Sequence, residues 1–99
     1  MFASVTTAQV NLDHVDELAP LYQRFLPTLQ AAKGWRGISV LVDRSTGQGL
    51  LVGLWETEAD ARLFETSGTF QQLLADYPQG LLVGPPQRQV VDVVFHASL

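Results

Sequence analysis

The chain has 99 residues, no cysteine, six basic and ten acidic side chains, and a formal net charge of −4 at neutral pH. This length favours a single domain over residues 1–99, and the lack of cysteine excludes disulfides, thiol catalysis and thiolate metal sites. The acidic balance argues against a nucleic-acid partner, because binding to phosphates needs a positive patch. Only 16% of the residues are charged whereas 46% are hydrophobic, which predicts spare apolar surface for a partner chain or an enclosed pocket.

The first part of the chain predicts a strand followed by a helix. Residues 2–10 are rich in Val, Thr and Ala, as strands are. Asp13 is a candidate N-cap, and apolar residues recur at helical spacing over residues 15–32. Pro20 and Pro27 interrupt this pattern, so we expect either one kinked helix or a short turn followed by a helix that starts near Pro20.

The middle of the chain predicts a hairpin. Residues 38–42 and 50–55 have the apolar composition of strands, and residues 43–49 between them contain two glycines suited to a turn. The second of these strands is apolar on both faces, whereas an antiparallel strand with one face in water alternates with polar residues. We therefore expect helices to cover one face of the sheet and a partner sheet to cover the other.

The last part of the chain predicts a second helical region and a final strand. Thr57 is a candidate N-cap with acidic residues in the turn after it, and Ser67-Gly68 should separate this helix from a short one. Residues 81–83 predict a small extra strand, and residues 87–96 predict the final strand. The order β-α-β-β-α-β predicts a ferredoxin-like α+β domain with one antiparallel sheet and the helices on one face.

Several short motifs occur along the chain in a fixed order. They are Gly34-Trp35-Arg36-Gly37, Asp43-x-x-Thr46-Gly47, Trp55-Glu56-Thr57-Glu58-x-x-Ala61 and Ser67-x-x-Phe70. In order and spacing, nearly the whole chain resembles the antibiotic biosynthesis monooxygenase (ABM) family. The resemblance implies a homodimer whose sheets pack face to face, a dimeric α+β barrel, with a pocket between the sheet and the helices of each subunit. It also implies oxygen chemistry, since some members oxidise polycyclic phenols or quinols without a cofactor and others degrade haem.

The chain departs from both catalytic patterns of that family. The haem-degrading members carry a Trp on the second helix and a His about ten residues later, where this chain has Phe64 and Leu74. The resemblance therefore argues against haem degradation. The antibiotic-type oxygenases carry an Asn before the Trp of the third strand and a Tyr after it, and this chain has Leu51 and Ala61 at those places. Of the Asn, Trp and Tyr of those oxygenases, only the Trp has a counterpart in this chain, which is Trp55.

Aromatic side chains are the candidate ligand contacts. We expect a pocket for a small apolar or aromatic ligand between helices and sheet, lined by Tyr22, Phe25, Trp35, Trp55, Phe64 and Phe70. Such a stripe also suits a packed core. Tyr22 is a candidate catalytic donor, because a buried tyrosine hydroxyl needs a partner, and Tyr77 is a further candidate. His96 is the candidate base because histidine titrates near neutral pH, the alternative being an exposed residue near the chain end.

The three arginines considered as ligands for an anionic group are Arg36, Arg62 and Arg88. We expect Arg62 on a solvated helix face and Arg88 in solvent or in an interchain ion pair, because arginine side chains mostly face solvent. The two histidines, His14 and His96, are far apart in sequence, so we expect no metal site.

Two functional hypotheses follow. The first is a cofactor-independent monooxygenase-like enzyme that acts on an aromatic phenol or quinol, which needs a base or oxyanion donors, an aromatic-sized pocket and exclusion of water. The second is a non-catalytic small-ligand-binding or dimerisation module of the same fold. Both hypotheses expect a homodimer through the sheet, no cofactor, no nucleic-acid or membrane partner and a cytoplasmic location, since the N-terminus has no signal-peptide pattern.

Overall fold

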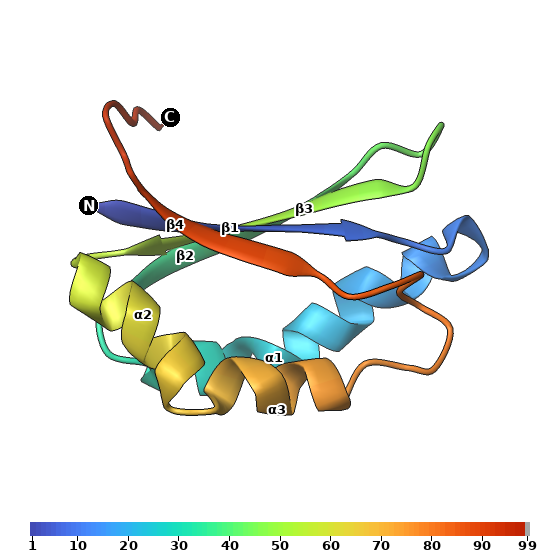
Figure 1. Cartoon of the computed structure of the whole chain (residues 1–99), viewed down its shortest axis with the longest axis horizontal. Helices are drawn as coiled ribbons and strands as arrows, with labels where there is room; N and C mark the ends of the chain where they lie inside the picture. The colour runs from blue at the N-terminus through green and yellow to red at the C-terminus, as the bar shows by residue number, and fades with distance from the viewer. Residues whose placement is uncertain (99) are drawn as a thin grey trace.

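The computed structural model describes residues 1–98 and has one antiparallel sheet with its helices on one face (Figure 1). The strands lie in the order β2-β3-β1-β4, and each neighbouring pair is antiparallel. This arrangement confirms the predicted ferredoxin-like α+β fold. In chain order the elements are β1 (Phe2–Gln9), the 3-10 helix η1 (Leu12–Glu17), α1 (Leu18–Ala31), β2 (Trp35–Val42), β3 (Gln48–Trp55), α2 (Glu58–Thr66), α3 (Thr69–Ala75) and β4 (Gln87–Asp92).

The first helical region follows the second of the two predicted alternatives, a short turn and then a helix. η1 ends before α1 begins at Leu18, so Pro20 lies in the first turn of α1, where no intrahelical donor is lost. The predicted cap at Asp13 is wrong. Asn11 caps η1 instead, because its extended backbone lets its side-chain oxygen accept a hydrogen bond from the backbone N–H of Asp13 at 3.0 Å.

The second helical region is as predicted. The hydroxyl of Thr57 accepts a hydrogen bond from the backbone N–H of Asp60 at 3.0 Å and so caps α2. Gly68 has a φ of +88° and separates α2 from α3. Because glycine adopts this left-handed conformation without steric strain, the chain can change direction at this point.

Several predicted strand limits need correction. The final strand ends at Asp92 rather than at residue 96, because β1 begins at Phe2 and provides no partner for residues farther along β4. The backbone N–H of Val93 still donates to the carbonyl of Met1 at 3.0 Å, and residues 94–98 are exposed. The extra strand expected at 81–83 is a single bridge between Leu82 and Val10. The hairpin strands begin earlier than predicted, β2 with a bulge before Gly37.

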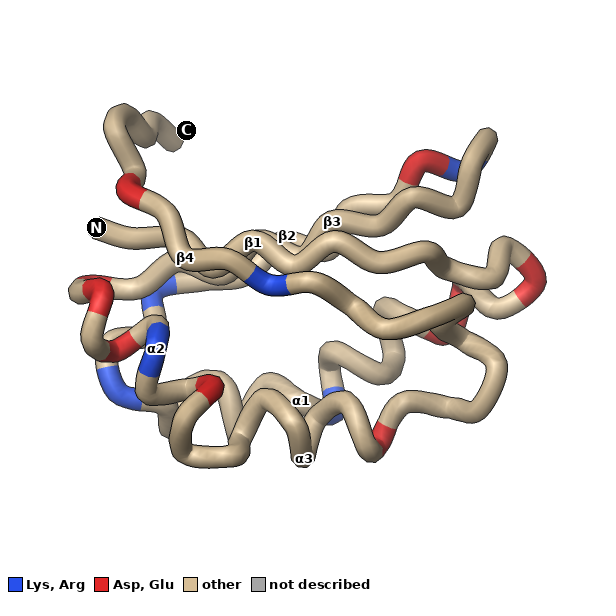
Figure 2. Tube along the Cα trace, in the orientation of Figure 1, with Lys and Arg blue, Asp and Glu red and all other residues tan. Residues whose placement is uncertain are grey.

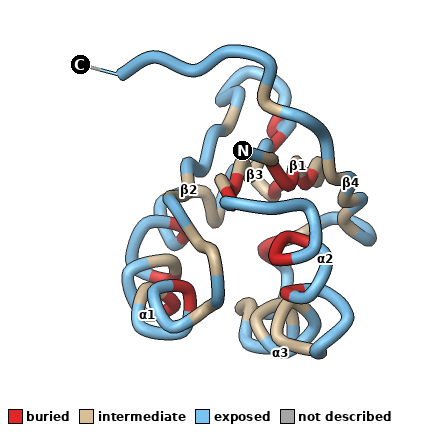
Figure 3. The backbone as a smooth tube through the Cα atoms, turned by 90° about the vertical axis from the view of Figure 1, so that its left-hand side faces the viewer, coloured by how far each residue is buried: buried red, intermediate tan, exposed pale blue. Residues whose placement is uncertain are grey.

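The two faces of the sheet differ in what covers them. The helices pack against one face, and the residues of the hydrophobic core cluster lie on the facing sides of sheet and helices (Figure 3). The opposite face carries apolar side chains that include Leu41, Leu50 and Val91, which are 49%, 38% and 39% exposed. The strands hold few charges, since their charged residues within 1–98 are Arg36, Arg88 and Asp92 (Figure 2). This face therefore has the apolar character predicted from the sequence of β3.

None of the helices within residues 1–98 is long and apolar enough to span a membrane.

Candidate functional site: a cavity between sheet and helices

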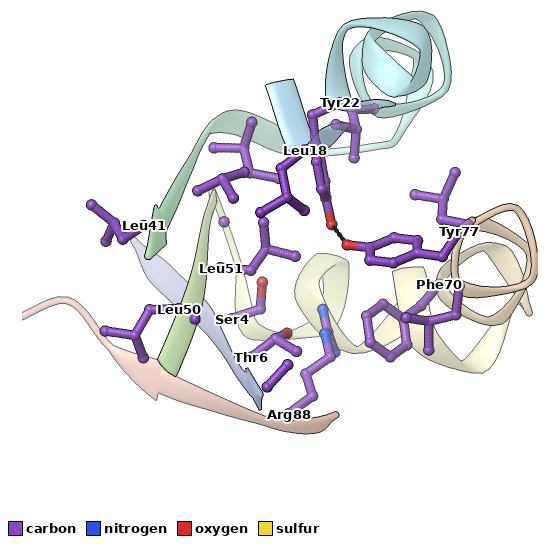
Figure 4. A pocket seen from close by; sticks show the side chains of 18 of the residues that line it. Ser4, Thr6, Leu18, Tyr22, Leu41, Leu50, Leu51, Phe70, Tyr77 and Arg88 are labelled. Carbon is purple, nitrogen blue, oxygen red and sulfur yellow. Dashed lines mark hydrogen bonds between the residues drawn. The ribbon is translucent and has the colours of Figure 1, made fainter. Parts of the chain in front are cut away.

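A largely apolar cavity lies between the sheet and the helices (Figure 4). The cavity itself has a volume of about 60 Å³, and the space around it that opens to solvent brings the total to about 800 Å³. Its ionisable lining residues within the described chain are Tyr22, Tyr77 and Arg88. The hydroxyls of Ser4 and Thr6 face it from β1, and the remaining lining is almost wholly aliphatic and aromatic. The cavity is therefore shaped for an apolar ligand with a small number of polar groups.

Most of the predicted ligand contacts line this cavity. They are Tyr22, Trp35, Trp55, Phe64 and Phe70. Phe25 is 5% exposed and belongs to the core instead, where its ring contacts Tyr22 edge-on at 5.3 Å and stacks on Tyr77 at 6.1 Å. Phe25 thus packs against two of the residues that line the cavity. Whether any of these side chains binds a ligand stays a prediction.

His96 lies outside the cavity. It belongs to the exposed residues beyond the end of β4, on the helix-free side of the sheet where the chain terminus lies (Figure 1). The residues that line the cavity include no histidine within 1–98. Its predicted role as a base thus gains no support from the geometry of one chain.

Two tyrosine hydroxyls meet inside the cavity. Tyr22 reaches in from α1 and Tyr77 from the segment after α3, and their oxygens are in hydrogen-bond contact (Figure 4). Burial raises the pKa of Tyr22 well above its usual range, and the neighbouring Tyr77 raises it further. Burial also raises the pKa of Tyr77, against the opposing effect of its bond to Tyr22. Both hydroxyls therefore stay protonated at neutral pH.

One hydroxyl hydrogen of this tyrosine pair is not used in a hydrogen bond within the described chain. One O–H group donates to the other oxygen, and within residues 1–98 the second O–H group has no acceptor. A ligand oxygen placed beside the pair would accept that hydrogen bond. Sequence reasoning ranked Tyr77 second and did not pair it with Tyr22, because no local spacing links residues that are 55 positions apart.

Trp55 is fixed in place by a buried hydrogen bond. Its indole N–H donates to the hydroxyl of Ser4 at 3.0 Å, and its ring packs against Phe64 with centroids 5.1 Å apart. Because the indole N–H is already used, Trp55 would contact a ligand through its ring. The indole N–H of Trp35 is buried and lacks a hydrogen-bond partner in the part of the chain that the structure describes.

Arg88 is a cavity residue that sequence reasoning placed elsewhere. Its side chain is only 5% exposed and donates to the carboxylate of Glu65 at 3.0 Å and to the backbone carbonyl of Ala61 at 2.9 Å. The expected solvent position or interchain pair is therefore wrong, since α2 of the same chain covers this part of β4. Burial lowers the pKa of Arg88, and Glu65 opposes that effect. Arg62 is more than half exposed and pairs with Glu58, as its predicted solvated position requires.

Among residues 1–98, no three side chains of the metal-ligating types come together to hold an ion.

Comparison with known proteins gives matches in structure but not in sequence. No family model and no curated protein matches the chain. A candidate antibiotic biosynthesis monooxygenase from Bordetella bronchiseptica superposes with a TM-score of 0.78 at 19% identity, over 95% of this chain and 97% of that one. The haem-degrader MhuD from Mycobacterium tuberculosis, solved with two haems in its active site, superposes with a TM-score of 0.77 at 12% identity, over 99% and 100% of the chains.

A third likeness comes from Deinococcus radiodurans. This candidate antibiotic biosynthesis monooxygenase superposes with a TM-score of 0.72 at 14% identity, over 100% of this chain and 98% of that one. The chain is thus an α+β protein with the ABM-like ferredoxin fold along nearly its whole length. At these identities the likeness concerns the fold, and the chemistry has to be argued from the cavity.

Proposed function

We propose that the chain is a monooxygenase-like protein that binds a flat phenol or quinol in this cavity and oxygenates it without a cofactor. The observation that carries the proposal is the Tyr22–Tyr77 hydroxyl pair, which is the polar end of an otherwise apolar space lined by aromatic rings. Structures with the same fold that are named monooxygenases support the reaction class. The substrate class rests on the shape and polarity of the cavity.

The atoms and electrons of the proposed oxygenation balance without a metal or flavin. A phenol with an activated ring methylene group loses a proton, and the resulting anion passes one electron to O₂. The organic radical and superoxide then combine to a peroxide. Loss of water from the protonated peroxide leaves a carbonyl, so that one oxygen atom of O₂ enters the product and the other leaves as water. The substrate itself supplies all the electrons.

The cavity contributes hydrogen-bond donors rather than a base. Its lining within residues 1–98 contains neither a carboxylate nor an imidazole. The tyrosine pair would donate to the oxygen on which the substrate anion places its charge, and such donors act strongly where water is excluded. We therefore infer that the substrate is acidic enough to ionise by itself, and that its rate of oxygenation rises with pH as it ionises.

Haem does not fit this cavity as a resident group. An axial ligand for its iron would have to be a histidine, thiolate, methionine or tyrosinate. In the described lining only the tyrosines are of these types, and burial raises the pKa of both, which opposes the tyrosinate form. Leu74 lines the cavity where the family resemblance would place a histidine. We therefore derive no step through haem.

Oxygen consumption tests the proposal. The purified protein is mixed with 1,8-dihydroxyanthrone, and oxygen uptake is compared with the uncatalysed rate. We expect uptake above that rate, and a fall of about 100- to 1,000-fold in kcat for the Y22F/Y77F double variant. Ser67→Ala is the matched control, since it removes a hydroxyl outside the cavity. Uptake no faster than the uncatalysed rate would contradict the proposal.

A non-catalytic ligand-binding module is the second candidate. Two observations favour it: Leu51 and Ala61 occupy the places of the family's polar residues, and no base lines the cavity within residues 1–98. This alternative predicts that aromatic phenols quench tryptophan fluorescence on binding and that oxygen consumption stays at the uncatalysed rate.

We also propose a homodimer through the helix-free face of the sheet. Leu41 and Leu50 lie opposite each other in the β2–β3 pair. Both are among the residues that line the cavity, but Figure 4 shows their side chains pointing away from the tyrosine pair. Val94 and Phe95, 96% and 86% exposed, follow β4 on the same side of the sheet (Figure 1). A second copy would remove this apolar surface from water, as the resemblance to dimeric ABM proteins implies.

A further inference from the structure

We propose that the sheet-side end of the cavity, formed by Arg88 and Thr6, binds a carboxylate of the ligand, so that the ligand class is aromatic acids. The inference rests on the proposed function, because it assumes that an aromatic ligand occupies the cavity. It adds a second polar contact, at the end away from the tyrosine pair (Figure 4).

The first observation is a buried cation with spare donors. The side chain of Arg88 is 5% exposed and lines the cavity. A guanidinium group carries five N–H donors, and the structure shows one bond to Glu65 and one to the carbonyl of Ala61. The remaining donors have no acceptor among residues 1–98. These donors are not buried orphans, since the indole nitrogen of Trp35 is the one buried side-chain nitrogen or oxygen without a partner among residues 1–98, and they remain open to an acceptor in the cavity that Arg88 lines.

The second observation is a hydroxyl next to that cation. Thr6 lies opposite Arg88 in the β1–β4 pair and is 6% exposed. Its hydroxyl faces the cavity and makes no hydrogen bond to any residue in 1–98. The ring of Phe70 lies 5.3 Å from the guanidinium carbon, which holds the group beside the cavity. A carboxylate placed here would accept from both the guanidinium and the hydroxyl.

A purely structural role for Arg88 makes a different prediction. Arg88 also ties β4 to α2 through its two bonds, and that role alone would produce no preference between an acid and its neutral analogue. Glu65 is the only carboxylate that the structure brings into contact with Arg88 in the described chain, and its side chain is 48% exposed. Glu65 would therefore compete with a ligand carboxylate rather than exclude it.

The experiment compares two probes of the same shape, 2-naphthoate and 2-naphthamide. Their dissociation constants at neutral pH are measured from quenching of tryptophan fluorescence, since Trp35 and Trp55 line the cavity. We expect the wild-type chain to bind the carboxylate at least about tenfold more tightly than the amide. Arg88→Met should abolish this preference, and Arg62→Met, which removes an exposed arginine on α2, should retain it. Equal binding of the two probes by the wild type, or no binding of either, overturns the inference.

Two further variants test the inference even if Arg88→Met fails to fold. Glu65→Gln removes the competing charge, so it should tighten binding of 2-naphthoate by about two- to fivefold and leave 2-naphthamide unchanged. Thr6→Val keeps the shape and removes the hydroxyl, so it should weaken 2-naphthoate alone. If neither variant changes the preference, Arg88 is structural only. The proposed function is tested separately by oxygen uptake with 1,8-dihydroxyanthrone. Because this compound has no carboxylate, its oxidation does not depend on the proposed contact with Arg88.

Discussion

The hydroxyl groups of Tyr22 and Tyr77 lie in hydrogen-bond contact inside the cavity, although 55 positions separate the two residues in the chain. Tyr22 belongs to α1, and Tyr77 follows α3. Phe25 packs against both rings. The contact therefore joins two helical segments and provides the polar end of the cavity.

Alkaline titration should report this pair directly, because Tyr22 and Tyr77 are the two tyrosines of the chain. Burial raises the pKa of both, so the tyrosinate absorbance near 295 nm should rise only at a pH above the ordinary tyrosine value of about 10. A tyrosine whose pKa is higher in the folded state than in the unfolded state stabilises the fold at pH values below its unfolded pKa. This contribution to the free energy of unfolding is lost as the pH rises through the folded pKa. Unfolding free energy should therefore fall above about pH 10. An ordinary titration midpoint in the folded protein would contradict the buried pair.

Ser4→Ala should destabilise the fold through Trp55. The substitution leaves the buried indole N–H of Trp55 without its acceptor, which costs about 1–3 kcal/mol. The free energy of unfolding in urea measures this loss. Ser39→Ala is the matched control on the same sheet, since Ser39 is exposed, and it should change stability by no more than about 0.5 kcal/mol. Equal effects of the two substitutions would show that the hydrogen bond adds nothing.

Gly34→Ala should cost more stability than Gly68→Ala. Both glycines have left-handed backbones, with φ of +76° and +88°, so alanine is strained by about 1–2 kcal/mol at either position. A Cβ atom on Gly34 would also overlap a carboxylate oxygen of Asp60, whereas one on Gly68 meets nothing within 4 Å. Urea unfolding should show an extra loss of about 1–3 kcal/mol at Gly34. The added substitution Asp60→Ala should recover part of it, and the absence of any recovery would count against the contact.

Val91→Asp should separate the proposed dimer. Val91 lies on the helix-free face opposite Ala3 and is 39% exposed in one chain, so a charge there is tolerated by the single fold but not by a dry interface. Sedimentation at micromolar concentration should show a dimer for the wild type and a monomer for the variant. Leu63→Asp is the control, since Leu63 is 49% exposed on α2 and should leave the dimer intact. A monomeric wild-type protein would refute the proposed interface.

The elements of the fold could be predicted because their signals are local. Apolar spacing marked α1, Thr57 marked the start of α2, and the glycine at position 68 marked the break before α3. The strand limits were less accurate, because pairing decides them. Residues 93–96 are as β-branched and apolar as those of β4, but β1 provides no partner for them.

The cavity could be predicted only in part. Aromatic residues at helical spacing indicated its lining, but Tyr77 is brought to Tyr22 by tertiary packing alone. For Arg88 the sequence indicates the face of β4 on which the side chain lies, but not what covers that face. Gln87 and Gln89 flank it, so strand alternation places Arg88 on the same face as Val90. That α2 covers this face, with Glu65 and the carbonyl of Ala61 within reach, is a property of the folded chain.

Successive side chains of β1 lie on opposite faces of the sheet. Ser4 and Thr6 face the cavity, whereas Ala3 and Val5 belong to the side that lacks helices. Under the proposed ligand site and dimer, substitutions one residue apart would therefore change ligand selectivity or self-association without coupling the two. The same arrangement makes β1 intolerant of insertions, since a shift by one residue would move the hydroxyls to the helix-free face and aliphatic side chains to the cavity side.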